Sequence, residues 1–391
     1  MKNFYFIYCA VALSLLAGCK MASSPSSDGP SSDGPSSDGP SSDGPSSEPG
    51  ASISGSKTWT SIAISPDGQY LAAVERDGHI YTSSNSGAKW ADLSIVPDSA
   101  IAGDKNWESI AMSDDGTKLA AVVGGVSGDG RHIYTFSNSE ATWTDRSTAT
   151  GSGIAGDKYW ASIAMSGNGE KLAAVAYNGH IYTSSDSGAT WTDRSTAGSV
   201  IAGNKNWFSI AMSPDGQYLA AVVNGEIGDH RHIYTSSDSG ATWTDRSTAA
   251  GSGIAGNKNW FSIAISDDGT KLAAVVYGGH LYTFTDSEAT WTDRSGTGSD
   301  IAGNKDWRSI AMSDDGTKLA AVASRGHIYT STDLGANWTD RSTATGSVIE
   351  GTKNWTSIAM SSDGQKLAAV ANPGNLYTAT NLGADWTDRS K

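Results

Sequence analysis

The chain has 391 residues and a formal charge of −14, from 27 Lys and Arg against 41 Asp and Glu. Only 17% of its residues are charged, and it contains 46 Gly and 14 Trp, a composition that favours an all-β protein with many tight turns. A nucleic-acid surface needs clustered Lys and Arg, so the acidic balance argues against a nucleic-acid partner. Two cysteines cannot form a disulfide scaffold.

Residues 1–18 have the pattern of an export signal. Lys2 is followed by an apolar run from Phe4 to Leu16, which is too short to span a bilayer as a helix. The run ends in Leu16-Ala17-Gly18-Cys19, which resembles the lipobox of bacterial lipoproteins. The resemblance implies cleavage before Cys19, acylation of Cys19 and a membrane anchor. Lys20 in place of Asp favours the outer membrane or cell surface; an ordinary secretory signal is the alternative.

Residues 19–50 are dominated by a repeated Pro-Ser-Ser-Asp-Gly unit. The segment offers no apolar area to bury, so we expect a disordered tether. It would hold residues 51–391 away from the lipid surface.

Residues 51–391 contain seven copies of one sequence repeat. A first series of tryptophans, one per unit, is spaced by 47 to 53 residues, which is typical of propeller blades or repeat arrays. Its members are Trp59, Trp107, Trp160, Trp207, Trp260, Trp307 and Trp355. A second series accounts for the other seven tryptophans: Trp90, Trp143, Trp191, Trp243, Trp291, Trp338 and Trp386.

Each unit contains four short β-runs separated by turn residues. In the third unit we expect strands at 161–166, 171–176, 180–185 and 190–195. Four antiparallel strands repeated seven times predict an all-β, seven-bladed β-propeller. A linear β-array is the alternative. Both terminal units are whole, so we expect closure to depend on packing between blades alone.

The turn before each second tryptophan carries a family resemblance. Residues 184–191, Ser-Ser-Asp-Ser-Gly-Ala-Thr-Trp, resemble the Asp-box, or BNR, repeat of sialidase-like propellers. Residues 236–243 and 331–338 match similarly, whereas Glu140 and Glu288 replace the glycine in units two and five. The resemblance implies structural turns on the face opposite an active centre. Their key residues are Asp186, Gly188, Trp191, Asp238, Gly240, Trp243, Asp333, Gly335 and Trp338.

The same resemblance argues against catalysis. Sialidases need a converging arginine triad, a Tyr–Glu pair, an Asp acid and an early Phe/Tyr-Arg-Ile-Pro motif, and that motif is absent. Most repeats carry an arginine in the phrase Trp-Thr-Asp-Arg-Ser, as at Arg146 and Arg194, and groups distributed once per blade cannot converge on one substrate. We therefore expect no enzyme activity and no cofactor, and we interpret the Asp-Arg pairs as charges that protect edge strands.

Six repeats place a histidine at the start of the third strand: His79, His132, His180, His232, His280 and His327. We expect turn capping or hydrogen bonds between blades, and no metal, because third strands of neighbouring blades are too far apart to share one ion. Asp229, His230 and His232 leave a weak local metal site as an alternative.

Variation between repeats is concentrated at one end, where blade-to-blade connections and the loops between strands two and three lie. We name this end the upper rim, and it is our candidate binding face. Its variable residues include Glu108, Phe208, Phe261, Arg308, Tyr177, Tyr277 and Arg325. Neutral drift in exposed loops is the alternative. A lysine before each first strand, such as Lys57 or Lys105, could attract anions or pair with carboxylates such as Asp104 and Asp157.

The sequence predicts a monomeric, membrane-tethered lipoprotein whose propeller binds a glycan or a protein without catalysis. One alternative is a sialidase-like glycoside hydrolase. The other is an assembly or scaffold factor, since photosystem II assembly factors have similar seven-bladed BNR propellers.

Overall fold

The computed structural model describes residues 53–95, 99–124, 131–148, 151–154, 156–225, 232–247, 254 and 258–391. The chain divides into Met1–Ser42 and Asp43–Lys391, and every described residue belongs to the second unit. The predicted signal peptide, Cys19 and the tether lie outside the described residues.

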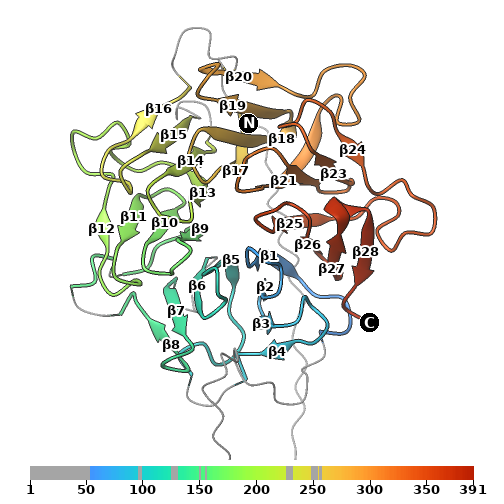
Figure 1. Ribbon diagram of the computed structural model, residues 1–391. Helices are drawn as coiled ribbons and strands as arrows, with labels where there is room; N and C mark the ends of the chain where they lie inside the picture. Colours follow the sequence, from blue (N-terminus) through green and yellow to red (C-terminus); the bar gives the residue numbers. More distant parts are fainter. Residues whose placement is uncertain are drawn as a thin grey trace, which may run out of the picture. The chain divides into compact units, whose positions relative to one another are not determined.

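The second unit consists of seven four-stranded antiparallel blades around a common axis, which confirms the predicted propeller (Figure 1). Blades 1 to 4 contain β1 (Trp59–Ile64), β2 (Leu71–Glu75), β3 (Ile80–Ser83), β4 (Ala91–Asp92), β5 (Trp107–Met112), β6 (Lys118–Val123), β7 (Ile133–Ser137), β8 (Thr142–Asp145), β9 (Trp160–Met165), β10 (Leu172–Ala176), β11 (Ile181–Ser184), β12 (Thr192–Asp193), β13 (Trp207–Met212), β14 (Leu219–Val223), β15 (Ile233–Ser236) and β16 (Thr244–Asp245).

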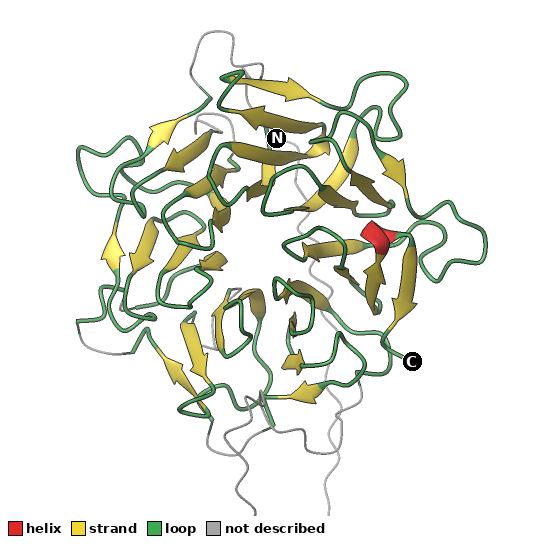
Figure 2. Cartoon of the chain, in the orientation of Figure 1, coloured by secondary structure: helices red, strands yellow, loops and turns green. Residues whose placement is uncertain are grey.

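Blades 5 to 7 contain β17 (Trp260–Ile265), β18 (Lys271–Gly279), β19 (Leu281–Thr285), β20 (Thr290–Asp293), β21 (Lys305–Met312), β22 (Leu319–Ala323), β23 (Ile328–Ser331), β24 (Thr339–Asp340), β25 (Trp355–Met360), β26 (Leu367–Ala371), β27 (Leu376–Thr380), η1 (Asn381–Gly383) and β28 (Asp385–Asp388). The 3₁₀ turn η1 is the only helical element in the described part of the chain (Figure 2). Pairing between β18 and β21 joins blades 5 and 6 into one eight-stranded sheet.

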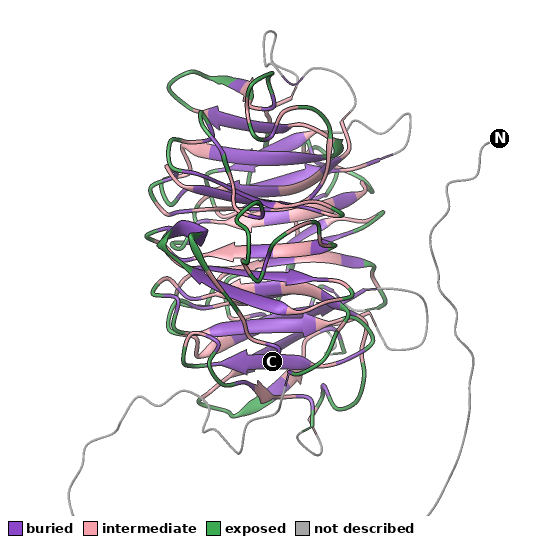
Figure 3. Cartoon of the chain, turned by 90° about the vertical axis from the view of Figure 1, so that its right-hand side faces the viewer, coloured by how far each residue is buried: buried purple, intermediate pink, exposed green. Residues whose placement is uncertain are grey.

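The core lies between blades, not within one. Second strands repeat Leu-Ala-Ala-Val and are buried on both faces, as in Leu172–Ala176, because a blade is covered by two neighbours (Figure 3). Small alanines allow the sheets to approach closely. The first tryptophan of every blade is almost fully buried and packs edge-on against a tyrosine of the third strand, as Trp59 does on Tyr81 at 5.4 Å.

A serine two residues after each first tryptophan links neighbouring blades. The Oγ of Ser61 accepts the backbone N–H of Ile110 of the next blade at 3.3 Å, and Ser109 accepts that of Ile163. The series continues around the ring and returns to blade 1, where Ser357 accepts the N–H of Ile62 at 3.3 Å. Each innermost edge strand therefore has a polar partner across the blade interface.

Closure does not depend on packing alone, contrary to our expectation. Lys57 of blade 1 exchanges two backbone hydrogen bonds with Gly374 of blade 7, at 2.9 and 3.1 Å. Equivalent pairs, such as Gly78 with Lys105, join other neighbouring blades, so the closing interface uses the same bonds as the rest of the ring.

Candidate functional site

A β-bulge aims one side chain per blade from the innermost strand at the upper rim. In blade 1, Trp59 pairs with Glu75 and Ser61 pairs with Val74, so Thr60 between them is the extra residue. All seven innermost strands have this shift, and bulges commonly redirect side chains next to functional sites. The seven redirected residues are Thr60, Glu108, Ala161, Phe208, Phe261, Arg308 and Thr356.

Two of these residues bond to the protein itself. Thr60 Oγ1 donates to the carbonyl of Trp107 at 2.8 Å, and Thr356 Oγ1 donates to that of Trp59 at 3.0 Å. A threonine at the bulge therefore adds a bond between blades and is satisfied without a ligand.

Glu108 is also satisfied internally. Arg76 Nη2 lies 3.1 Å from its Oε2, and the carboxylate is partly buried beneath Gly124, where an added Cβ would lie 2.3 Å from the Glu108 Cγ. Burial raises the pKa of Glu108, and the Arg76 charge opposes that rise. Although predicted for the binding face, Glu108 is occupied by an ion pair.

The other predicted residues of the rim come together as one group, which we name the aromatic cluster: Tyr177, Phe208, Phe261, Tyr277 and Arg308. The ring centroids of Tyr177 and Phe208 are 6.2 Å apart, those of Phe208 and Phe261 are 4.8 Å apart, and those of Phe261 and Tyr277 are 6.0 Å apart. Tyr177 and Tyr277 are 40% and 39% exposed. Four rings thus extend across blades 3 to 5 with two of them open to solvent.

Arg308 completes the aromatic cluster. Its guanidinium carbon lies 4.9 Å from the Phe261 ring centroid and 4.8 Å from that of Tyr277. Burial lowers the pKa of Arg308, the nearby Tyr277 and Asp306 oppose that change, and Arg325 adds to it. Within the described residues no carboxylate forms an ion pair with Arg308, in contrast to Arg76.

Arg325 connects the aromatic cluster to a hollow between blades 6 and 7. The hollow has a volume of about 380 Å³, within the range of ligand-binding pockets. Its lining residues include Arg325, Lys353, Asn354, Asn375 and Tyr377. Asn375 stands where the other blades carry a larger histidine.

At the opposite end, the three predicted turns form compact hydrogen-bonded loops. In blade 3, Asp186 accepts the backbone N–H of Thr190 at 2.9 Å, and the indole N–H of Trp191 donates to the carbonyl of Gly188 at 3.0 Å. The turns with Asp238, Gly240 and Trp243 and with Asp333, Gly335 and Trp338 repeat these contacts.

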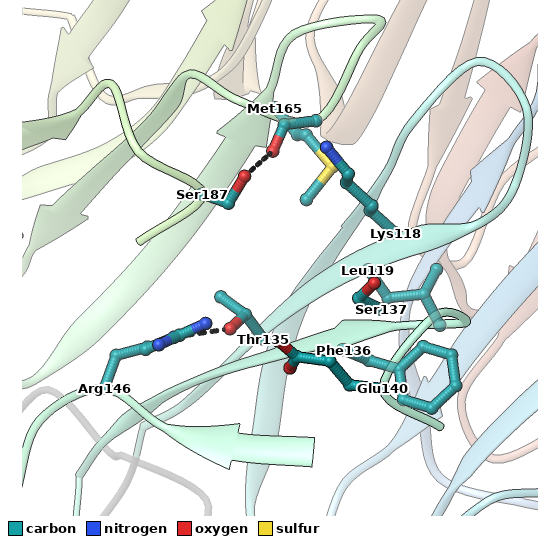
Figure 4. A pocket seen from close by; sticks show the side chains of 10 residues that line it. Lys118, Leu119, Thr135, Phe136, Ser137, Glu140, Arg146, Met165 and Ser187 are labelled. Carbon is teal, nitrogen blue, oxygen red and sulfur yellow. Dashed lines mark hydrogen bonds between the residues drawn. The ribbon is translucent and has the colours of Figure 1, made fainter. Parts of the chain in front are cut away.

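Blades 2 and 5 lack this glycine, and the indole N–H groups of Trp143 and Trp291 have no partner among the described residues. Beside the blade 2 turn is a cavity of about 140 Å³ lined by residues that include Phe136, Glu140 and Arg146 (Figure 4). The Arg146 Nε donates to Thr135 Oγ1 at 2.6 Å at this cavity.

Each histidine bonds within its own blade, which we did not expect, and His79 and His132 also face a carboxylate on the connection to the next blade, Asp104 at 3.1 Å and Asp157 at 3.9 Å. His180 Nδ1 lies 2.6 Å from Asp193 Oδ2 on the outermost strand, and the other five repeats have the same pair. Asn375 replaces the histidine in blade 7 and donates to Asp388. Asp229 and His230 lie outside the described residues, in which no group of three potential metal ligands occurs.

The Asp-Arg pairs also have a structural role that differs from edge protection. The aspartate accepts from the histidine, and the arginine Nε donates to a threonine of the third strand, as Arg194 does to Thr183 at 2.7 Å. Both charged residues therefore attach the short outermost strand to its neighbour.

One lysine of the upper rim pairs with a neighbouring carboxylate as we considered, since Lys57 Nζ lies 3.3 Å from Glu75 Oε2. Asp104 lies 3.1 Å from His79 Nε2, whereas Lys105 lies over the Tyr134 ring. Lys57 contacts Glu75 and Tyr81, and the other lysines also lie over or beside a tyrosine or a carbonyl oxygen.

Sequence reasoning missed an acidic group where the first two strands of each blade turn. Asp114, Asp267 and Asp314 precede the Asp-Gly turns, and successive blades are joined here by backbone bonds such as Asp267 N–H to Asp314 O at 3.0 Å. Burial, with repulsion from Asp314 and Asp114, raises the pKa of Asp267 to about 6. Adjacent aspartates in three in-phase turns were the available signal.

Among the described residues, no helix is long and apolar enough to cross a membrane.

Comparison with known proteins supports the propeller and no narrower family. The family model for the WD domain, G-beta repeat, matches residues 47–81 only. No curated protein matches the sequence.

Two solved structures share the fold. The GH74 xyloglucanase from Xanthomonas campestris is 16% identical with a TM-score of 0.62, over 87% of this chain and 55% of the xyloglucanase. YCF48, solved bound to a D1 peptide, is 16% identical with a TM-score of 0.57, over 86% of this chain and 98% of YCF48. The chain is therefore similar to both proteins in fold alone, and spans about half of the xyloglucanase.

Proposed function

We propose that this chain is a lipid-anchored protein of the cell envelope whose propeller binds carbohydrate without catalysis. The observation that carries the proposal is the aromatic cluster, in which Tyr177, Phe208, Phe261 and Tyr277 form a continuous series of rings at the upper rim. Exposed aromatic faces beside a few polar groups are suited to stacking against the apolar faces of sugar rings.

The positions of the residues in the aromatic cluster support the interpretation that this surface was selected for binding. Its residues occupy bulge and loop positions that are held by backbone bonds, as where Tyr277 N–H donates to the Asn259 carbonyl at 2.8 Å. A rigid frame with variable side chains is the usual arrangement for binding on propellers. Neutral drift would not be expected to gather four rings and one guanidinium side by side.

A non-catalytic role fits the chemistry of the same residues. The aromatic cluster offers rings and one guanidinium but no pair of carboxyl groups, which glycoside hydrolysis ordinarily needs. The repeated arginines, such as Arg194 and Arg246, each bond to a threonine of their own blade instead of converging on a substrate.

We also propose that the turns at the opposite end are Asp-box turns with a structural role. Asp186, Asp238 and Asp333 each organise a turn whose glycine carbonyl holds the second tryptophan. The anchor remains our prediction from Leu16 to Cys19, with a monomer at the outer membrane or cell surface.

A glycan array probed with the full-length protein in detergent tests the binding role. We expect saturable binding to one class of polysaccharide, and loss of that binding in Phe208→Ala. Turnover of a fluorogenic sialoside or glucoside that a single carboxylate variant abolishes would contradict non-catalysis. Mass spectrometry of the mature amino terminus, compared with Cys19→Ala, tests the anchor; an unmodified Cys19 would contradict it.

A second candidate is recognition of a peptide, for which Arg308 is the favouring observation, since an unpaired guanidinium can hold a carboxylate. The similar YCF48 structure contains a bound D1 peptide. Absence of glycan binding together with a stoichiometric co-purifying protein that Arg308→Ala releases would favour this candidate.

A further inference from the structure

The aromatic cluster lies beside an unusual concentration of positive charge. The protein as a whole carries −14, yet Arg308, Arg325 and Lys353 occupy neighbouring positions at the upper rim of blades 6 and 7. Within the described residues, none of these three cations forms an ion pair with a carboxylate. Two other cations of the rim do pair with a carboxylate, Arg76 with Glu108 and Lys57 with Glu75.

The position of the Arg308 guanidinium suits binding of a ligand rather than stabilisation of the fold. Its guanidinium lies over the rings of Phe261 and Tyr277, and its N–H groups have no hydrogen-bond partner in the described residues. Burial disfavours the Arg308 charge, the nearby Asp306 offsets part of that cost without forming an ion pair, and an anionic ligand would offset more of it. A planar guanidinium can hold a carboxylate or sulfate through two parallel hydrogen bonds.

The hollow of about 380 Å³ extends this positive surface away from the rings. Arg325 is exposed at its edge, and Asn354 and Asn375 add amide groups to its lining. Lys353, whose ammonium group donates to the Glu350 carbonyl at 3.2 Å, adds a second charge. The rings, the two arginines and the hollow follow one another along the rim from blade 3 to blade 7.

Building on the proposed function, we propose that the ligand is an acidic glycan whose sugar rings stack on the aromatic cluster. Its ring-borne carboxylate or sulfate groups bind Arg308 and Arg325, and the chain continues into the hollow. A series of four aromatic faces fits a polymer of sugar rings better than a single acidic peptide terminus, which would need only one or two of them.

Oligogalacturonate and its fully methyl-esterified form are a matched pair of probes, because they share the same rings and differ in charge. We expect the full-length protein in detergent to bind oligogalacturonate at least tenfold more tightly than the ester by calorimetry. The affinity should fall as salt is raised, because opposite charges are screened.

Arg308→Ala should reduce binding of the acidic probe at least tenfold, and Arg308→Lys should reduce it less. Lys89→Ala, which removes one exposed charge from a turn at the opposite end, is the control and should leave affinity unchanged. Unchanged thermal unfolding of Arg308→Lys shows that the variant is folded.

Equal affinity for the acid and the ester, or affinity that is independent of salt, would overturn this inference while leaving carbohydrate binding intact. Binding of neither glycan, with binding of a peptide that ends in acidic residues, would overturn both the inference and the proposed function.

Discussion

Arg76 and Arg308 lie on the same rim of the same fold, yet they differ in their surroundings. Arg76 pairs with Glu108, and its neighbours Thr60 and Thr356 donate to backbone carbonyls, so this sector is satisfied by the protein itself. Arg308 lies over the rings of Phe261 and Tyr277 and has no such pair. The difference teaches that equivalent bulge positions serve as bonds between blades in one sector and present unpaired groups in the other.

The largest effect is expected from removing a ring of the aromatic cluster. Phe261→Ala takes away the neighbour of both Phe208 and Arg308, and we expect a loss of glycan affinity of about 30-fold, or about 2 kcal/mol. Calorimetric titration measures it. Equal glycan affinity of Phe261→Ala and wild type would show that the aromatic cluster is not part of the binding surface.

Breaking the ion pair between Arg76 and Glu108 should lower the free energy of unfolding and leave glycan affinity unchanged. Arg76→Ala leaves the Glu108 carboxylate partly buried without its partner, and we expect a loss of about 1–2 kcal/mol at pH 7 in urea unfolding. Since burial raises the pKa of Glu108, the charged form is the unfavourable one. The loss should therefore shrink as the pH falls to about 4.5 and below, where the carboxyl group is protonated in both the folded and the unfolded chain.

Arg76→Ala combined with Glu108→Gln is the matched control, which should recover most of the lost stability at pH 7. A loss that is the same at pH 4 and pH 7 would show that the charge of Glu108 is not its cause.

A smaller effect is expected at the threonine bulge. Thr60→Val keeps the shape of the side chain but removes the donor to the Trp107 carbonyl, so we expect a loss of about 1 kcal/mol in unfolding free energy with glycan affinity unchanged. If Thr60→Val bound the glycan more weakly, the ligand surface would have to include the part of the rim around Thr60.

The smallest effect is expected at the opposite end, where carboxylates crowd one another. The pKa of Asp267 is raised to about 6, so its stabilising contribution is present below about pH 4 and is lost as the pH rises through 6. Asp267→Asn should melt slightly higher than wild type at pH 8 and equally at pH 4, measured by calorimetry. A lower melting temperature for the variant at pH 8 would mean that the carboxylate is stabilising in its charged form.

The repeat arithmetic was sufficient to predict the fold, because the two tryptophan series fixed the number of blades and the turn residues fixed four strands in each. The variable rim residues were also identifiable from sequence, since Phe208, Phe261 and Arg308 interrupt an otherwise regular phrase. That these three side chains lie close together could not be predicted from sequence, because it depends on a bulge that shifts the register between Trp and Ser in every innermost strand.

The partner of each side chain was harder to predict than the place of each residue in its repeat. His180 and Asp193 lie on two strands that were predicted to form a hairpin, but the register that brings their side chains together was not predicted, so we assigned the histidines to other roles. That Glu108 has a partner and Arg308 has none follows only from the three-dimensional placement of Arg76.

Hydrogen–deuterium exchange of the full-length protein, with and without saturating oligosaccharide, tests the division of the rim most directly. The account predicts slower exchange in peptides that cover 205–212, 258–265 and 275–280, and no change in those that cover 57–64 and 106–112. Protection confined to blades 1 and 2, or to the turns at the opposite end, would contradict it.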